Sequence, residues 1–159
     1  MEIYLLRHAI AEDAAPGLPD ADRALTPEGK EKLRRVLKRA RQAAVSPSLI
    51  LTSPYRRALE TAEIAAESLG YEGRLISTVT LVPDASPHDL WEEIRSRRGE
   101  RAILLASHEP LMRSTTSFLL GAPALQVDFK KAGLVRLDCD RFGGEPRGVL
   151  KWMLTPAVA

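Results

Sequence analysis

Cysteine, histidine and aromatic residues are scarce in this chain of 159 residues, which has one cysteine, three histidines and 5% aromatic residues. A single cysteine, Cys139, cannot form a disulfide within the chain, so we expect no dependence on an oxidising compartment. No apolar run reaches the length of a membrane span, and the run before Arg7 is too short for a signal peptide. We therefore expect a cytoplasmic protein with no membrane association.

An excess of charge of one sign is also absent. Lysine and arginine total 23 residues and aspartate and glutamate 21, for a formal net charge of +2. Nucleic-acid-binding proteins usually carry a stronger positive excess, so we expect no nucleic-acid partner. The histidines are far apart and lack a paired spacing such as H-x-x-x-H, which disfavours a metal hydrolase and predicts no metal or other cofactor.

Continuous apolar runs, typical of the buried strands of a parallel sheet, occupy residues 2–7, 48–52 and 102–107, and a more polar strand is expected at 74–81. Helices alternate with these strands. Their starts are marked by a capping hydroxyl or a proline, at Thr26-Pro27, Ser53-Pro54, Ser86-Pro87 and near Pro110. The polar face of the first helix, over residues 30–41, is basic; we expect a solvated face, with docking of an acidic partner as the alternative.

After Gly121 the pattern changes to segments with strand character, at 125–129, 133–138 and 149–154, of which the last two are expected to pair. The length predicts one domain over residues 1–159. The order of elements predicts an α/β fold, a three-layer sandwich whose central sheet is mostly parallel, with helices on both faces and antiparallel C-terminal edge strands.

Two of the expected strands are followed by a histidine, His8 after 2–7 and His108 after 102–107. Ligands bind outside the carboxyl ends of parallel strands, so both histidines are expected at one edge of the sheet. Arg7 precedes His8, and Arg57 lies on the first turn of the helix that follows a third strand. Histidines and arginines gathered at strand ends indicate a pocket for a phosphoryl group and hence an enzyme.

The chemistry of these side chains supports that interpretation. A neutral imidazole is a good nucleophile towards phosphorus when its other ring nitrogen is held as a donor, a role open to His8. Arginine stays charged and offers a planar fork that matches phosphate oxygens. Arg56 lies on another side of the helix from Arg57 and is expected in solvent. As a cation, His108 would add a charge-assisted hydrogen bond.

Three segments resemble the signature segments of the histidine phosphatase superfamily: Arg7-His8-Ala9, the stretch from Ser53 to Ala62, and Ser107-His108-Glu109-Pro110. The stretches 5–13 and 22–29 are similar to those of the small SixA-type phosphohistidine phosphatases. The order, spacing and short length all fit, so the resemblance covers the whole chain.

The resemblance implies a role for each matching residue. His8 matches the nucleophile that becomes phosphorylated, and Arg7 and Arg57 match the phosphate-binding arginines. His108 matches the second histidine that contacts the phosphoryl oxygens, and Arg23 resembles an additional phosphate contact of the small members. We therefore expect His8, Arg7, Arg57 and His108 to be catalytic, with Arg7, Arg23, Arg57 and His108 binding phosphate.

Two departures from the family pattern matter. Ala9 replaces the usual glycine, so the backbone there is expected not to need a positive φ. The general acid of the larger members has two candidates here, Asp84 and Glu109, and the sequence leaves the choice open. The insertions that wall the pocket of larger sugar-phosphate enzymes are absent, which suits a phosphorylated protein side chain.

The resemblance thus implies a metal-independent phosphatase that dephosphorylates protein phosphohistidine through a covalent phosphohistidine on His8. Its partner would be a phosphohistidine-carrying protein, such as a histidine phosphotransfer domain. One alternative is a small-molecule phosphomonoesterase of the same superfamily, and another is a phosphoprotein-binding module without activity. The intact set of His8, His108 and the arginines argues against the module. The sequence leaves the partner's identity and the oligomeric state open.

Overall fold

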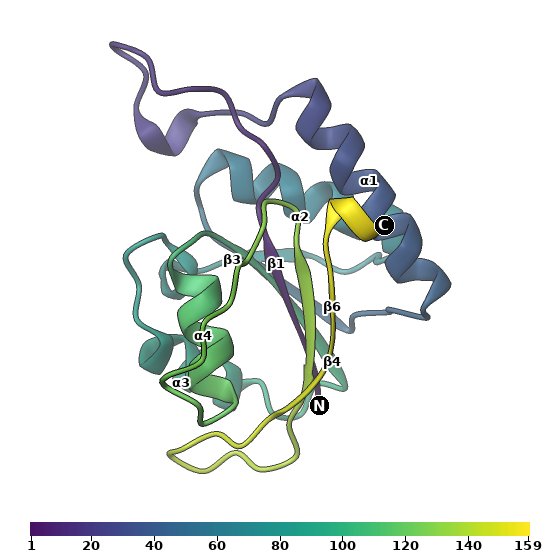
Figure 1. Ribbon diagram of the computed structural model, residues 1–159, viewed down its shortest axis with the longest axis vertical. Helices are drawn as coiled ribbons and strands as arrows, with labels where there is room; N and C mark the ends of the chain where they lie inside the picture. Colours follow the sequence, from purple (N-terminus) through teal and green to yellow (C-terminus); the bar gives the residue numbers. More distant parts are fainter.

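The apolar runs of the sequence form the centre of a six-stranded sheet in the computed structural model, which describes all 159 residues (Figure 1). The strands are β1 (Glu2–Arg7), β2 (Leu49–Thr52), β3 (Leu75–Ser77), β4 (Ala102–Ser107), β5 (Leu134–Asp138) and β6 (Val149–Leu154). Their order across the sheet is β3-β2-β4-β1-β5-β6. The first four in this order run parallel, and β5 and β6 are antiparallel additions at one edge, as the sequence predicts.

Two helices cover each face of the sheet. The helices are α1 (Pro27–Gln42), α2 (Arg56–Leu69), α3 (Pro87–Ser96) and α4 (Leu111–Leu119), with three short 3-10 helices, η1 (Asp20–Asp22), η2 (Val79–Leu81) and η3 (Pro156–Val158). One hydrophobic core lies between the sheet and α1 and α2, and a second lies between the sheet and α3 and α4. The fold is therefore the expected three-layer α/β sandwich (Figure 1). None of its helices combines the length and the apolar character that a membrane crossing needs.

The register of the parallel strands determines where the chain leaves the sheet. Arg7 at the end of β1 is paired with Ser107 at the end of β4. Thr52 at the end of β2 is paired with Ala106 of β4. The segments that follow three adjacent strands therefore begin at one edge of the sheet. Arg7, His8 and His108 lie at two of these strand ends, Arg57 lies in the first turn of the helix after the third, and Arg23 lies elsewhere, after η1.

Hydroxyl caps begin two of the helices where the sequence predicts. The side chain of Thr26 accepts a hydrogen bond from the amide of Gly29 at 3.0 Å and caps α1. Ser86 accepts one from the amide of Asp89 at 3.1 Å and caps α3. Each satisfies one of the amides that the first turn of a helix leaves unpaired.

Three boundaries differ from the sequence prediction. Helix α2 begins at Arg56 rather than at Ser53-Pro54, because Tyr55 is extended and Ser53 is buried in the turn, where it accepts a hydrogen bond from the Tyr55 amide. The expected strand 74–81 is short, because the side chain of Thr78 caps the turn η2. Residues 125–129 form no strand, and Phe129 at the end of this segment is buried in the core between the sheet and α3 and α4 instead.

The backbone of the turn after His8 is in direct contact with the start of α1. The amide of Thr26 donates a hydrogen bond to the carbonyl of Ile10 at 2.9 Å, and Ala11 and Leu25 form an isolated antiparallel β-bridge. Gly29 is buried in the first turn of α1, and a Cβ there would collide with the backbone of Ile10. The glycine is therefore required by the close approach of two backbone segments.

We expect Gly29→Ala to destabilise the protein by up to about 2 kcal/mol, because overpacking against backbone costs about 1–3 kcal/mol and alanine returns only roughly 1 kcal/mol of helix propensity. Denaturant unfolding measures the change. Gly99→Ala is the matched control, since a Cβ at Gly99 meets nothing within 4 Å. Equal stability of the two variants would contradict the argument.

Candidate active site

His8 and His108 lie side by side at the carboxyl ends of β1 and β4. Their ring centroids are 5.1 Å apart with an interplanar angle of 61°. The amide of His8 donates to the carbonyl of Ser107 at 2.8 Å, which extends the strand pairing by one step and holds the two turns together. Both rings are almost fully buried, with 7% of His8 and 1% of His108 exposed. The proximity that we expected from the strand ends is thus observed.

The ring of His8 is oriented by its own turn. Its Nδ1 lies 2.7 Å from the carbonyl oxygen of Ala9. A carbonyl can only accept, so Nδ1 carries the proton and Nε2 keeps its lone pair. The Ala9 amide in turn donates to the hydroxyl of Thr61 on α2 at 3.2 Å, and Ala9 does not adopt a positive φ. The turn that holds the imidazole is therefore anchored to a helix.

Burial lowers the pKa of His8 to about 4. The hydrogen bond to the Ala9 carbonyl opposes this shift, and the positive charges of Arg57, Arg7 and Lys131 add to it. Because a cation is disfavoured in a buried site surrounded by other cations, His8 is neutral at pH 7. A neutral ring with a free Nε2 is the form that can attack phosphorus.

A buried serine holds the ring of His108 in place. Its Nε2 lies 2.8 Å from the hydroxyl of Ser53, and its ring meets the edge of Tyr55 at 5.1 Å between centroids. Burial lowers its pKa to about 3, and the neighbouring His8 and Arg57 add to the shift. His108 is therefore neutral in the free protein, and the cation that we expected from the sequence would form only beside a bound anion.

Two arginines approach the histidines from different elements. Arg7 donates to the carbonyl of Phe129 at 2.7 Å, and Arg57, with 5% of its surface exposed, stacks over the ring of Tyr55 at 5.1 Å. The Nε atoms of both arginines and Nδ1 of His108 are buried and have no protein partner. Buried donors without a partner are rare in folded proteins. Arg56, in contrast, is exposed and pairs with Glu60, as expected.

Asp20 is a site residue that the sequence analysis missed. Its backbone carbonyl and its Oδ2 accept from the two terminal nitrogens of Arg57 at 2.8 and 3.1 Å, and its Oδ1 accepts from Nε of Arg23 at 2.9 Å. Partial burial raises the pKa of Asp20, but the hydrogen bonds from Arg23 and Arg57 outweigh it and lower the pKa. A carboxylate on η1 thus joins Arg23 to Arg57. The only indication in the sequence that Asp20 belongs to the site is that it precedes Arg23 by three residues, a spacing at which the two side chains can pair.

The two candidates for a general acid occupy different environments. Glu109, next to His108, accepts from the amide of Arg113 at 2.8 Å, and its side chain is 18% exposed. Burial raises its pKa, while the amide of Arg113 and the charge of Arg7 oppose the shift. Asp84 is exposed and forms no ion pair. Of the two, Glu109 is the carboxylate close enough to Arg7 to interact with it.

The site as a whole is cationic and built from donors. Arg7, Arg23 and Arg57 provide guanidinium groups at a strand edge that also carries two neutral histidines. No three side chains of histidine, cysteine, aspartate or glutamate are grouped so that they could hold a metal ion. The arrangement can bind the oxygens of a phosphoryl group and present a nucleophilic nitrogen to its phosphorus.

Comparison with known proteins agrees with this chemistry. Residues 3–79 match the histidine phosphatase superfamily (branch 1). An uncharacterized protein of Picosynechococcus sp. is 32% identical over 139 residues, which are 86% of this chain and 84% of that protein.

Solved structures resemble the chain over nearly its whole length. The protein histidine phosphatase SixA complexed with tungstate is 22% identical, with a TM-score of 0.87 over 99% of this chain and 98% of that one. A protein of Agrobacterium tumefaciens assigned as a SixA phosphohistidine phosphatase is 27% identical, with a TM-score of 0.84 over 98% and 97%. A mycobacterial glucosyl-3-phosphoglycerate phosphatase is 17% identical, with a TM-score of 0.71 over 94% and 96%.

The family match begins at β1, runs through the turn that carries His8 and the helix that carries Arg57, and is accompanied by a fold shared with SixA. The chain therefore belongs to the histidine phosphatase superfamily, as a phosphatase with the SixA-type fold.

Proposed function

We propose that the protein hydrolyses phosphohistidine carried by another protein and that His8 is its nucleophile. The observation that carries the nucleophilic role is the 2.7 Å contact of His8 Nδ1 with the Ala9 carbonyl, and the likeness to the SixA structures supports the substrate class. This contact, together with a pKa lowered to about 4, leaves Nε2 unprotonated and free to react at neutral pH. The partner would be a phosphohistidine-carrying protein, of which a histidine phosphotransfer domain is the simplest example.

The reaction takes two steps at phosphorus. Nε2 of His8 attacks the phosphoryl group, the P–N bond to the substrate imidazole breaks, and that imidazole takes a proton from water as it leaves. A water molecule then attacks the phosphorus on His8, the P–Nε2 bond breaks, inorganic phosphate is released, and a proton from this water neutralises the hydroxide left by the first step. His8 returns to its neutral form, with its proton still on Nδ1.

Positive charge around the phosphoryl oxygens lowers the barrier of both steps. A hydrogen bond to a charged group contributes about 1.5–3 kcal/mol, so several that converge on the transition state supply a large part of the acceleration. Arg57 presents its terminal nitrogens to Asp20 in the free protein. The incoming phosphoryl dianion would bind Arg57 together with this carboxylate or in its place. The negative charge of the dianion would also favour protonation of His108.

The alternative is a small-molecule phosphomonoesterase, and Glu109 is the observation that favours it. An alkoxide leaving group needs a proton in the transition state, and a general acid with a raised pKa can supply it. Solved structures of the same fold include phosphatases named for glucosyl-3-phosphoglycerate and for phosphoserine. A phosphoimidazole leaves as a neutral ring and gains much less from such an acid.

His8 should be the covalent site. We expect rapid quenching during turnover of a phosphohistidine peptide to trap a phosphoenzyme that is labile in acid and stable in base, because the P–N bond has that lability. The same label should be missing from His8→Ala. Label retained in His8→Ala, or found on a serine or on Cys139, would refute the mechanism.

Arg57→Lys should lower kcat/KM by about 10²-fold or more, because an ammonium cannot reproduce the bidentate fork. Arg56→Lys is the matched control on the same helix and should behave as wild type, since Arg56 is exposed. A near-normal kcat/KM for Arg57→Lys would show that the pocket is wrongly assigned.

Activity should survive excess EDTA, because guanidinium groups and histidine take the place of a metal. Restoration of an EDTA-treated protein by an added metal would contradict this assignment.

The two substrate classes are separated by comparing kcat/KM on a phosphohistidine peptide and on a sugar phosphate. We expect the peptide to be preferred, and Glu109→Gln and Asp84→Asn each to change its turnover by less than about tenfold, equivalent to about 1.4 kcal/mol. Asp84→Asn serves as the control for a lost exposed carboxylate. Equal efficiency on both substrates, with ester hydrolysis collapsing in Glu109→Gln, would instead favour the phosphomonoesterase.

A further inference from the structure

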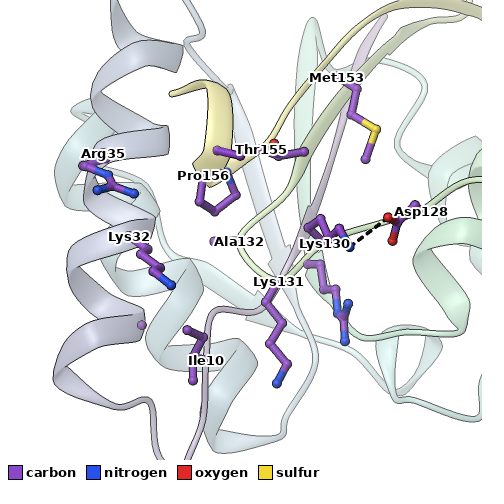
Figure 2. Close-up of a pocket in the computed structure, with 13 residues that line it drawn as sticks. Ile10, Lys32, Arg35, Asp128, Lys130, Lys131, Ala132, Met153, Thr155 and Pro156 are labelled. Atoms are coloured by element: carbon purple, nitrogen blue, oxygen red, sulfur yellow. Dashed lines mark ion pairs between the residues drawn. The ribbon is translucent and has the colours of Figure 1, made fainter.

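A groove of about 800 Å³ adjoins the catalytic site. Its walls are helix α1, the segment 128–132 and the end of the chain at 155–157. Arg7 and Ile10, on either side of the turn that carries His8, contribute to the same groove. In Figure 2, Lys32 and Arg35 of α1 stand on one side, Lys130 and Lys131 on the other, and Pro156 lies between them. The groove therefore leads away from the phosphoryl site across the surface.

The lining of the groove is strongly cationic. Five of its side chains are basic and one is acidic. Asp128 pairs with Lys130 at 2.8 Å (Figure 2). Lys32 pairs with Glu28, outside the groove, at 2.9 Å. Arg35 and Lys131 form no ion pair with any carboxylate of the chain. The groove thus holds a positive charge that its own residues do not neutralise.

The exposure of these cations distinguishes between two kinds of occupant. Small-molecule sites use a few fixed polar groups in an enclosing cavity. Here Arg35, Lys130 and Lys131 are exposed and belong to two separate segments, and the lining also includes the apolar side chains of Ile10, Met153 and Pro156. Long, exposed basic side chains beside apolar lining residues suit an extended acidic segment, because such side chains can pair with its carboxylates in many different geometries.

We propose that this groove binds an acidic segment of the phosphohistidine-carrying protein, next to its phosphorylated histidine. The inference rests on the proposed function and names the feature by which that substrate is recognised. It also assigns a role to part of the basic face of α1, since Lys32 and Arg35 face the groove while Arg34 and Lys38 do not line it. Arg7 lines the groove and also belongs to the phosphoryl site, so a segment bound in the groove would lie directly beside the phosphoryl group.

The test uses two synthetic phosphohistidine peptides that differ only in their flanks, glutamates on both sides in one and glutamines in the other. The variant Lys32→Ala/Arg35→Ala is compared with Arg34→Ala/Lys38→Ala, which removes the same charge from the same helix outside the groove. For the wild type we expect a lower KM for the glutamate peptide. We expect Lys32→Ala/Arg35→Ala to raise that KM by about tenfold at low salt with kcat unchanged, and to leave the glutamine peptide unaffected.

The control variant should have the same KM as the wild type for both peptides. The preference for the glutamate peptide should disappear near 1 M salt, where the Debye length is only about 3 Å and exposed charges no longer attract each other. If the wild type hydrolyses both peptides equally, the docking inference fails while the proposed function stands. Equal losses on both peptides would also overturn it, because the groove would then only position Arg7. If neither peptide is hydrolysed and a bisphosphorylated sugar is, the proposed function fails and the docking inference with it.

Discussion

The parallel pairing of β1 with β4 is the constraint on which the site depends. It sets Arg7 opposite Ser107, and one further hydrogen bond, from the His8 amide to the Ser107 carbonyl, carries the pairing into the two turns. Two histidines a hundred positions apart are thereby brought to 5.1 Å between ring centroids. A slip of the register by one residue would turn every side chain of the strand to the other face and separate the rings.

Burial then determines the chemical state of these rings. A histidine near the surface would be partly protonated at neutral pH, and a protonated nucleophile cannot attack phosphorus. Burial among guanidinium groups lowers the pKa of His8, and the Ala9 carbonyl determines which nitrogen keeps its proton. The same cations that disfavour a positive charge on His8 favour the negative charge of a phosphoryl group. In the proposed reaction, one electrostatic environment would therefore both keep His8 in its reactive form and attract the phosphoryl group.

Asp20 and the basic groove extend this environment in two directions. Asp20 joins Arg57 to Arg23 and gives the guanidinium of Arg57 an anionic partner in the free protein. The groove continues the positive potential from Arg7 towards α1 and the 128–132 segment. Charges of this kind act over about 10 Å at moderate salt, so in the proposed docking the cations of the groove would attract an acidic surface before any direct contact with His8 forms.

The sequence by itself determined the strand and helix order, the single α/β domain and the strand ends that carry His8, Arg57 and His108, because apolar runs and helix caps are local signals. It also indicated that Arg56 and Arg57 point in different directions from one helix, and the family motif, in which the arginine is the fourth residue after Ser53, selected Arg57. It could not determine the end of the short strand at 75–77, where Thr78 caps a turn, or the missing strand at 125–129, where Phe129 is buried in a core built from distant segments. Only the tertiary structure decided that Asp20 meets Arg57 and that Lys32 faces Lys131 across a groove, since charges on distant exposed segments leave no pattern in the sequence.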